Sequence, residues 1–300
     1  VGYRQFCNKL WNVIKFALQF VDDFSPTATL LENLMKSGKM AIRDKFMVSR
    51  LMNAVESVND CLVSYKFGDA QQAAYQMWMD DLCDVYIELI KPVVYDKSEE
   101  NKDSRWAAQA TLWVSLDIGL RLLHPMMPFV TEELWQRLPG RGTLGSGETQ
   151  SIMIAKYPEC NDSYKGKECE QSMASTLKVV KACRSLRAAY HIVDKVQTHF
   201  FVKVTGASEH HVIAQSDDIK TCAKASALEI NVSEDSIPQS DGTVIIDEET
   251  TLLMDIKGLV NYDSETKRLT KSLKSTFPAF TNMEKKIAAP GYQENAADDL

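Results

Sequence analysis

The sequence has 300 residues, of which 45% are hydrophobic, and its formal net charge at pH 7 is −7. This composition is typical of a globular protein with enough apolar material for two domains. No run of eighteen apolar residues occurs, which argues against a membrane-spanning helix, and residues 1–20 lack a signal-peptide layout. The seven cysteines stand singly without metal-ligand spacing. They favour reduced thiols in a cytoplasmic compartment and predict no metal site.

Residues 3–20 predict an amphipathic helix with two stripes. One stripe is apolar and predicts a core-facing seam: Phe6, Leu10, Val13, Ala17 and Phe20. The other carries two amides, a cation and an aromatic ring: Gln5, Lys9, Asn12 and Phe16. Unpaired RNA bases are recognised by this chemistry, through stacking and hydrogen bonds to base edges. A merely solvated polar face is the alternative. Trp11 lies off the seam and is expected to be buried.

Four more helices are predicted from apolar spacing in the first half of the chain, at residues 48–65, 69–92, 112–123 and 131–138. Between residues 22 and 39 the sequence holds turn signals. Gly68 is expected to end the first of these helices, and Pro92 to stop the second within a few residues. Together with the opening helix they predict a helical bundle over residues 1–138, so the fold class is mainly α.

A Gly-rich linker is predicted at residues 139–150, and a small α/β domain at residues 151–261. Within that domain we expect helices at 168–190 and 209–227, and strands at 198–204, 229–232, 243–247 and 250–256. The last part, residues 262–300, predicts a thin basic helix that Pro278 interrupts. A disordered tail over residues 289–300 is expected to follow it.

Basic residues cluster in three segments despite the negative net charge. They are Lys36, Lys39, Arg43, Lys45 and Arg50; then Lys178, Lys181, Arg184 and Arg187; then Lys267, Arg268, Lys271, Lys274, Lys285 and Lys286. Segregated charge of this kind is typical of a protein with one phosphate-facing side, and chance clustering is the alternative.

Four stretches resemble, in order, the C-terminal part of valyl-tRNA synthetases. The opening FCNKLWN resembles the first helix of their anticodon-binding domain, and residues 46–92 resemble its second and third helices. LLHPMMPFVTEELWQRLP at residues 122–139 resembles its last helix. DIKGLVNYDSETKRLTKSLK at residues 255–274 resembles the start of their C-terminal arm. NKLWN separates the chain from the isoleucine and leucine enzymes, and the likeness is to the eukaryotic cytosolic type of this class I family.

The resemblance implies where the transfer RNA for valine would bind. Phe16 would stack on an unstacked anticodon base, while Lys9 and Asn12 would reach base edges or a nearby phosphate. Arg4 and Lys15 would contact phosphates. A fourth set would meet the tRNA backbone nearer the elbow: Lys267, Arg268, Lys271 and Lys274. In the family, the arm that carries this last set pairs with a second helix as a coiled coil.

The chain lacks the HIGH and KMSKS stretches with which class I synthetases handle ATP, and no Walker-type glycine loop or catalytic motif occurs. We therefore expect a piece of a longer ligase with no catalytic residue and no cofactor of its own, inactive alone. Its expected partners are tRNA, the catalytic domain of the same polypeptide and other translation factors. The alternatives are a non-catalytic protein-interaction module and a synthetase-like regulatory paralogue.

Overall fold

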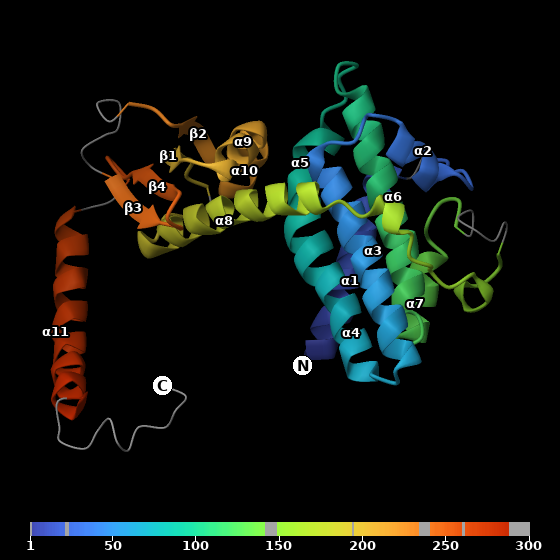
Figure 1. The fold of residues 1–300 in the computed structure, drawn as a ribbon, viewed down its shortest axis with the longest axis horizontal. Helices are drawn as coiled ribbons and strands as arrows, with labels where there is room; N and C mark the ends of the chain where they lie inside the picture. Colours follow the sequence, from blue (N-terminus) through green and yellow to red (C-terminus); the bar gives the residue numbers. More distant parts are fainter. Residues whose placement is uncertain are drawn as a thin grey trace.

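The computed structural model describes residues 2–21, 24–141, 149–193, 195–233, 241–259 and 262–287. As predicted, the described part is mainly helical and contains a small four-stranded sheet. A helical bundle, an α/β layer and one long isolated helix follow one another along the chain (Figure 1). Within the described ranges, no helix is long and apolar enough to cross a membrane.

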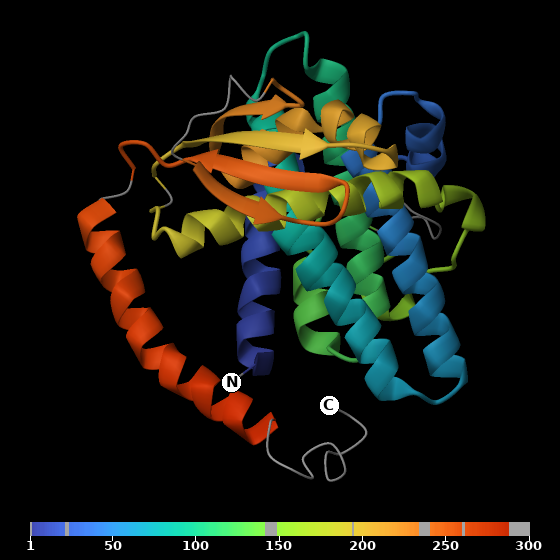
Figure 2. The ribbon, with the colours of Figure 1, turned by 60° about the vertical axis from the view of Figure 1, so that its left-hand side comes forward.

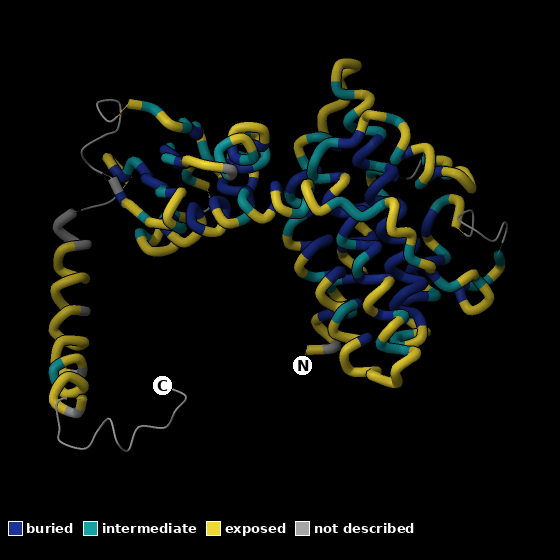
Figure 3. The backbone as a smooth tube through the Cα atoms, viewed as in Figure 1, coloured by how far each residue is buried: buried dark blue, intermediate teal, exposed yellow. Residues whose placement is uncertain are grey.

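The bundle surrounds one central helix. Its elements are α1 (Gly2–Val21), α2 (Leu30–Lys36), α3 (Ile42–Val63), α4 (Phe67–Gln76), the π-helix η1 (Met77–Tyr86), α5 (Ile87–Tyr95), α6 (Lys102–Leu123) and α7 (Pro128–Trp135). Helix α6 contacts all the other α-helices of this group, and nearly every residue from Ala107 to Leu123 is buried. Figure 3 shows this buried centre. Gly119 leaves room for the Trp78 ring, whose indole N–H donates to the Gly119 carbonyl at 3.2 Å.

The structure corrects three local predictions in the bundle. Helix α2 lies in the segment expected to be turns, because Leu30 and Leu34 are buried in the core and tertiary packing stabilises even a short helix. Gly68 does not end a helix but lies inside α4, and the turn before it uses Tyr65 at a φ of 57°. The predicted helix at 69–92 is found as the continuous run α4–η1–α5. Its middle is π-helical, with the Ile87 N–H donating to the Leu82 carbonyl.

Two short 3-10 helices, η2 (Ile152–Ile154) and η3 (Asp162–Tyr164), follow the bundle. Ile152 is buried in the bundle core, and the Tyr157 hydroxyl donates to the Leu122 carbonyl at 2.9 Å. The predicted domain boundaries at residues 138 and 151 stay a prediction. Residues 142–148 of the predicted linker lie outside the described residues.

The α/β layer contains α8 (Lys167–Ala189), β1 (Thr198–Val204), α9 (Ala207–Ala214), α10 (Ser216–Ala223), β2 (Ala225–Ile230), β3 (Asp241–Ile245) and β4 (Thr250–Asp255). The strand order is β2-β1-β4-β3, with β1 parallel to β2 and the other neighbours antiparallel. Helix α8 contacts the sheet and the bundle helix α3, and α10 contacts the sheet and the bundle helix α5, so both lie between the sheet and the bundle (Figure 2).

The predicted helix at 209–227 is wrong in its extent. It is broken at Gln215, whose buried side-chain amide donates to the Ser172 hydroxyl at 2.6 Å. Helix α10 then ends where Lys224 adopts a left-handed conformation, and residues 225–227 belong to β2. The strand at 198–204 and the hairpin of β3 and β4 are confirmed.

Helix α11 (Tyr262–Ile287) stands apart from the bundle in Figure 1. The predicted break at Pro278 is wrong, because the helix continues through it. An exposed proline removes one hydrogen bond and bends a helix without ending it, and Figure 2 shows α11 curved. The predicted disordered tail at residues 289–300 lies outside the described residues.

Candidate functional site

Helix α1 separates a buried side from an exposed side. Phe6, Leu10, Val13 and Ala17 are buried as predicted, whereas Phe20 is only half-buried. Ile14 and Val21 widen the buried arc, which faces α6 and α7. The opposite side carries four exposed residues at steps of four, three and four: Arg4, Asn8, Trp11 and Lys15. This exposed face is free of acids.

Trp11 is 42% exposed, so its predicted burial is wrong. Ile14 fills the arc next to the seam, and the Trp11 ring instead packs against the guanidinium of Arg137, 5.0 Å from the ring centroid. Such a cation–π contact holds the indole at the surface with part of it open. In the sequence, Trp11 lies at helical spacing from Arg4 and Lys15, and this spacing indicates that it belongs to the exposed face.

Phe16 lies at the flank of α1 that meets α5. Its ring is half-buried, with its centroid 5.0 Å from that of Phe20, and the Lys91 ammonium lies 6.0 Å from it. Phe20 in turn meets Tyr95 edge-on at 4.9 Å, and Tyr95 is 60% exposed. Lys91 and Tyr95 were not predicted from the sequence, since only the fold brings α5 beside α1. An aromatic row with one cation therefore borders the exposed face.

The polar residues predicted on α1 are accessible. Lys9 forms an ion pair with Asp84 of η1 at 3.4 Å, with both side chains about half exposed. Exposed pairs contribute little, so Lys9 can exchange this carboxylate for a phosphate. Asn12 is exposed, and Arg4 and Lys15 form no ion pair with any described residue. The structure thus brings these four residues and Phe16 together on one helix.

The second predicted set lies elsewhere. Lys267, Lys271 and Lys274 are exposed on α11, and Arg268 donates to the Ala189 carbonyl at 3.4 Å. Because α11 stands apart from α1 (Figure 1), the structure does not bring this set beside Phe16.

The basic residues of the cluster at residues 36–50 are mostly paired with acids, and their contact with phosphate stays a prediction. Lys36 pairs with Glu32 and Lys39 with Asp103, while Arg43 and Arg50 pair with Asp218 and Asp81. Arg43 and Asp218 are 175 residues apart in sequence and 2.9 Å apart in the fold. Burial raises the pKa of the Asp218 carboxyl, and the charge of Arg43 opposes that rise.

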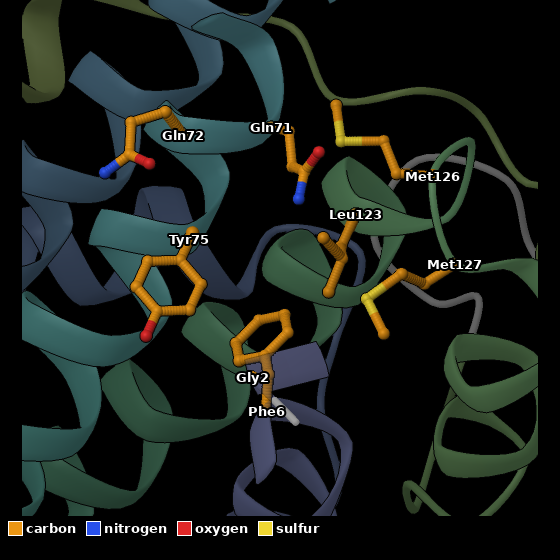
Figure 4. A pocket seen from close by; sticks show the side chains of 8 residues that line it. All are labelled: Gly2, Phe6, Gln71, Gln72, Tyr75, Leu123, Met126 and Met127. Carbon is orange, nitrogen blue, oxygen red and sulfur yellow. The ribbon is translucent and has the colours of Figure 1, made fainter. Parts of the chain in front are cut away.

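Within the described part of the chain, a cluster of possible metal ligands and a pocket near α1 do not include the residues predicted to bind RNA. Glu56, Cys160 and Asp162 gather within 4.8 Å, but the Lys165 ammonium lies 2.8 Å from Glu56 and 2.7 Å from Asp162, where it balances their charge. A pocket of about 500 Å³ opens at the start of α1 (Figure 4). Its lining is uncharged: Gly2, Phe6, Gln71, Gln72, Tyr75, Leu123, Met126 and Met127.

Comparison with known proteins relates this chain to tRNA ligases. The family model described as the anticodon-binding domain of tRNA ligase matches residues 44–202. The chain is 32% identical, over its whole length, to the mitochondrial valine–tRNA ligase 1 of Arabidopsis thaliana, of which it covers 27%. It is 33% identical over 97% of its length to the valine–tRNA ligase of Rattus norvegicus, covering 22% of that protein. For the Fervidobacterium nodosum enzyme the identity is 30% over 99% of the chain, which covers 31% of it. The chain thus spans about a quarter of the length of these relatives.

Proposed function

Because the chain belongs to the family of anticodon-binding domains of tRNA ligases, we propose that it is the tRNA-binding part of a valine–tRNA ligase. The observation that carries this proposal is the acid-free exposed face of α1, bordered by the half-open ring of Phe16. Cations and an aromatic ring on one helix suit an unstacked strand, since cations attract its phosphates and the ring stacks on a base.

Each predicted residue has a role in this proposal. Phe16 stacks on an anticodon base, Lys9 and Asn12 reach base edges or phosphate, and Arg4 and Lys15 contact phosphates. Helix α11 contacts the tRNA backbone nearer the elbow through Lys267, Lys271 and Lys274, with Arg268 shared with the Ala189 carbonyl. We also propose that a second helix pairs with the apolar side of α11.

The activity of the whole ligase, which joins valine to tRNA with ATP, is assigned to the parts that the relatives have beyond this chain. We expect no valine-dependent exchange between ATP and pyrophosphate by the 300 residues alone. Within the family we propose a eukaryotic cytosolic enzyme, supported by the likeness to the rat protein and by seven free thiols, as in a reducing compartment. Subcellular fractionation tests this location.

A salt titration tests the binding function. With about four basic contacts, the slope of log affinity for the valine tRNA against log salt should be roughly −3 to −4. Arg4→Gln combined with Lys15→Gln should make that slope shallower, whereas the same double change at Lys102 and Lys156 should not. A slope near zero for the unmodified chain contradicts the proposal.

A further inference from the structure

A second aromatic ring lies at the border of the exposed face of α1, on the flank that meets α7. Trp11 is 42% exposed, and the guanidinium of Arg137 lies 5.0 Å from its ring centroid. At the other border, the Lys91 ammonium lies 6.0 Å from the ring of Phe16. Each border of this face therefore presents one aromatic ring with one cation beside it, an arrangement that cation–π attraction stabilises.

The indole N–H of Trp11 is available to a ligand. Among the residues that the structure describes, Trp11 contacts Arg137 through its ring, and its N–H donates to none. The three fully buried indoles differ, because each donates to an oxygen inside the bundle: Trp78 to the Gly119 carbonyl, Trp113 to the Pro139 carbonyl and Trp135 to the Asp117 carboxylate. A tryptophan ring is a donor only, so Trp11 can add one hydrogen bond to an acceptor on a base, a sugar or a phosphate.

The fold fixes the arginine that supports this ring. Arg137 follows α7, and the residues before and after it in the turn, Leu134 and Leu138, are each 1% exposed. Its guanidinium also pairs with Glu133, so the acid nearest to this border has its charge balanced. The guanidinium covers one part of the Trp11 ring from the side of the bundle, and the exposed part of the ring stays accessible.

On α1 itself, a cation and two amides separate the two rings. Positions 11 and 16 of a helix lie about 140° apart around its axis and roughly 7.5 Å apart along it. The helix surface between them carries Asn8, Asn12 and Lys15, which are all exposed. Lys15 forms no ion pair with any described residue, so it can meet a phosphate. A nucleic-acid strand that crosses α1 at Lys15 would have one ring on either side.

We propose that Trp11 is a second base-stacking residue, and that the anticodon loop crosses α1 with one unstacked base on Phe16 and another on Trp11. This inference rests on the proposed function and adds a residue to its binding site. Every base has a face that can stack, so an exposed indole binds an unstacked base whatever its identity. Trp11 therefore contributes affinity and holds the loop splayed across the helix.

The test compares Trp11→Ala, which removes the ring, with Trp11→Phe, which keeps a smaller one. The matched control is Phe129→Ala, because Phe129 is a 90% exposed ring on α7 of the same bundle. Each protein is titrated with a hairpin that contains the anticodon loop of the valine tRNA, and with a series of hairpins that each lack one loop base. Thermal melts verify that the variants fold.

We expect Trp11→Ala to bind the intact hairpin about tenfold more weakly, as for the loss of one base–aromatic stack. Trp11→Phe should recover most of this loss, and Phe129→Ala should bind as the unmodified chain does. Removal of one particular base should weaken binding to the unmodified chain but cause no further loss with Trp11→Ala. For Phe16→Ala, the base whose removal has no further effect should be a different one.

Indole fluorescence gives a second measurement that needs no alanine variant. The hairpin should quench the fluorescence of the unmodified chain, because a base would cover the Trp11 ring. Trp11→Phe should remove most of this quenching, whereas Trp106→Phe, which changes a half-buried indole of α6, should retain it.

Three results would overturn the inference: equal affinity of Trp11→Ala and the unmodified chain for the intact hairpin, quenching that persists in Trp11→Phe, or one and the same base for both rings. The first is also the result expected if Trp11 contacts another protein instead of RNA. In all three cases the unmodified chain still binds RNA, so the proposed function stands. If the unmodified chain binds neither the hairpin nor the full-length tRNA, the proposed function itself fails.

Discussion

Basic side chains bind different partners in the bundle and in the α/β layer. In the bundle they hold acids, as Arg50 holds Asp81 and Arg121 holds Asp117. In the α/β layer, Arg184 and Arg187 instead donate to backbone carbonyls, those of Cys222 and Val196. Basic clusters that look similar in sequence therefore differ in the partners that they hold. Net charge along a segment says little until its partners in space are known.

The largest effect should come from the buried pair inside the bundle. Asp117 is 1% exposed and accepts from both Arg121 and the Trp135 indole, so Asp117→Ala leaves a buried charge without its partner. The expected loss is about 3–5 kcal/mol of unfolding free energy, measured by urea denaturation.

Glu133 and Arg137 offer the matched control, because they have the same i,i+4 spacing at an exposed site. Glu133→Ala should cost less than about 1 kcal/mol. Similar losses for the two variants would contradict the distinction between buried and exposed pairs.

Phe16→Ala tests whether the flank of α1 is a binding surface. If the ring stacks on a base, the variant should lose about 1–3 kcal/mol of tRNA binding. Its contact with Phe20 also predicts a modest loss of stability, so binding is measured on the folded fraction. Trp11→Ala is the comparison at the centre of the exposed face. Unchanged tRNA affinity together with a large drop in melting temperature would show that Phe16 is a core residue and not a binding residue.

The sequence predicted the elements whose pattern is local. The seam of α1 and the strand Thr198–Val204 are found because apolar periodicity and β-branched residues report on one element at a time. Helix α2 was not predicted because its stability comes from two leucines that pack in a core made by residues far away in the sequence. Among the site residues, Phe16 and Lys9 were named with the family's help. The exposed position of Trp11 could be read from its helical spacing to Arg4 and Lys15, whereas its contact with Arg137 depends on the fold.

The smallest effect should be a pH dependence of the unfolding free energy, because the bundle holds the imidazole of His124 neutral. Thr131 donates its hydroxyl to the Met127 carbonyl, so the His124 Nδ1–H donates to Thr131 at 2.7 Å and leaves Nε2 buried without a partner. Burial lowers the pKa of His124 below its usual value near 6.5, against the opposing charge of Glu132.

Because the unfolded chain binds this proton more readily, the stability that His124 contributes is complete above about pH 6.5 and is lost as the pH falls below it. Urea melts at pH 5 and pH 7 should show this step, and His124→Asn should reduce it. An equal pH step in the variant would assign the effect to other groups.

We propose that the α1 face reads the anticodon, and exchange of the anticodon bases gives the sharpest test of this role. Two tRNA transcripts are compared, the valine tRNA and the same molecule with its anticodon bases replaced, at one salt concentration. We expect the exchanged transcript to bind about tenfold or more weakly, because stacking and base-edge contacts are lost while the phosphate contacts remain. Phe16→Ala should narrow this difference in affinity. Equal affinity for the two transcripts would contradict the claim.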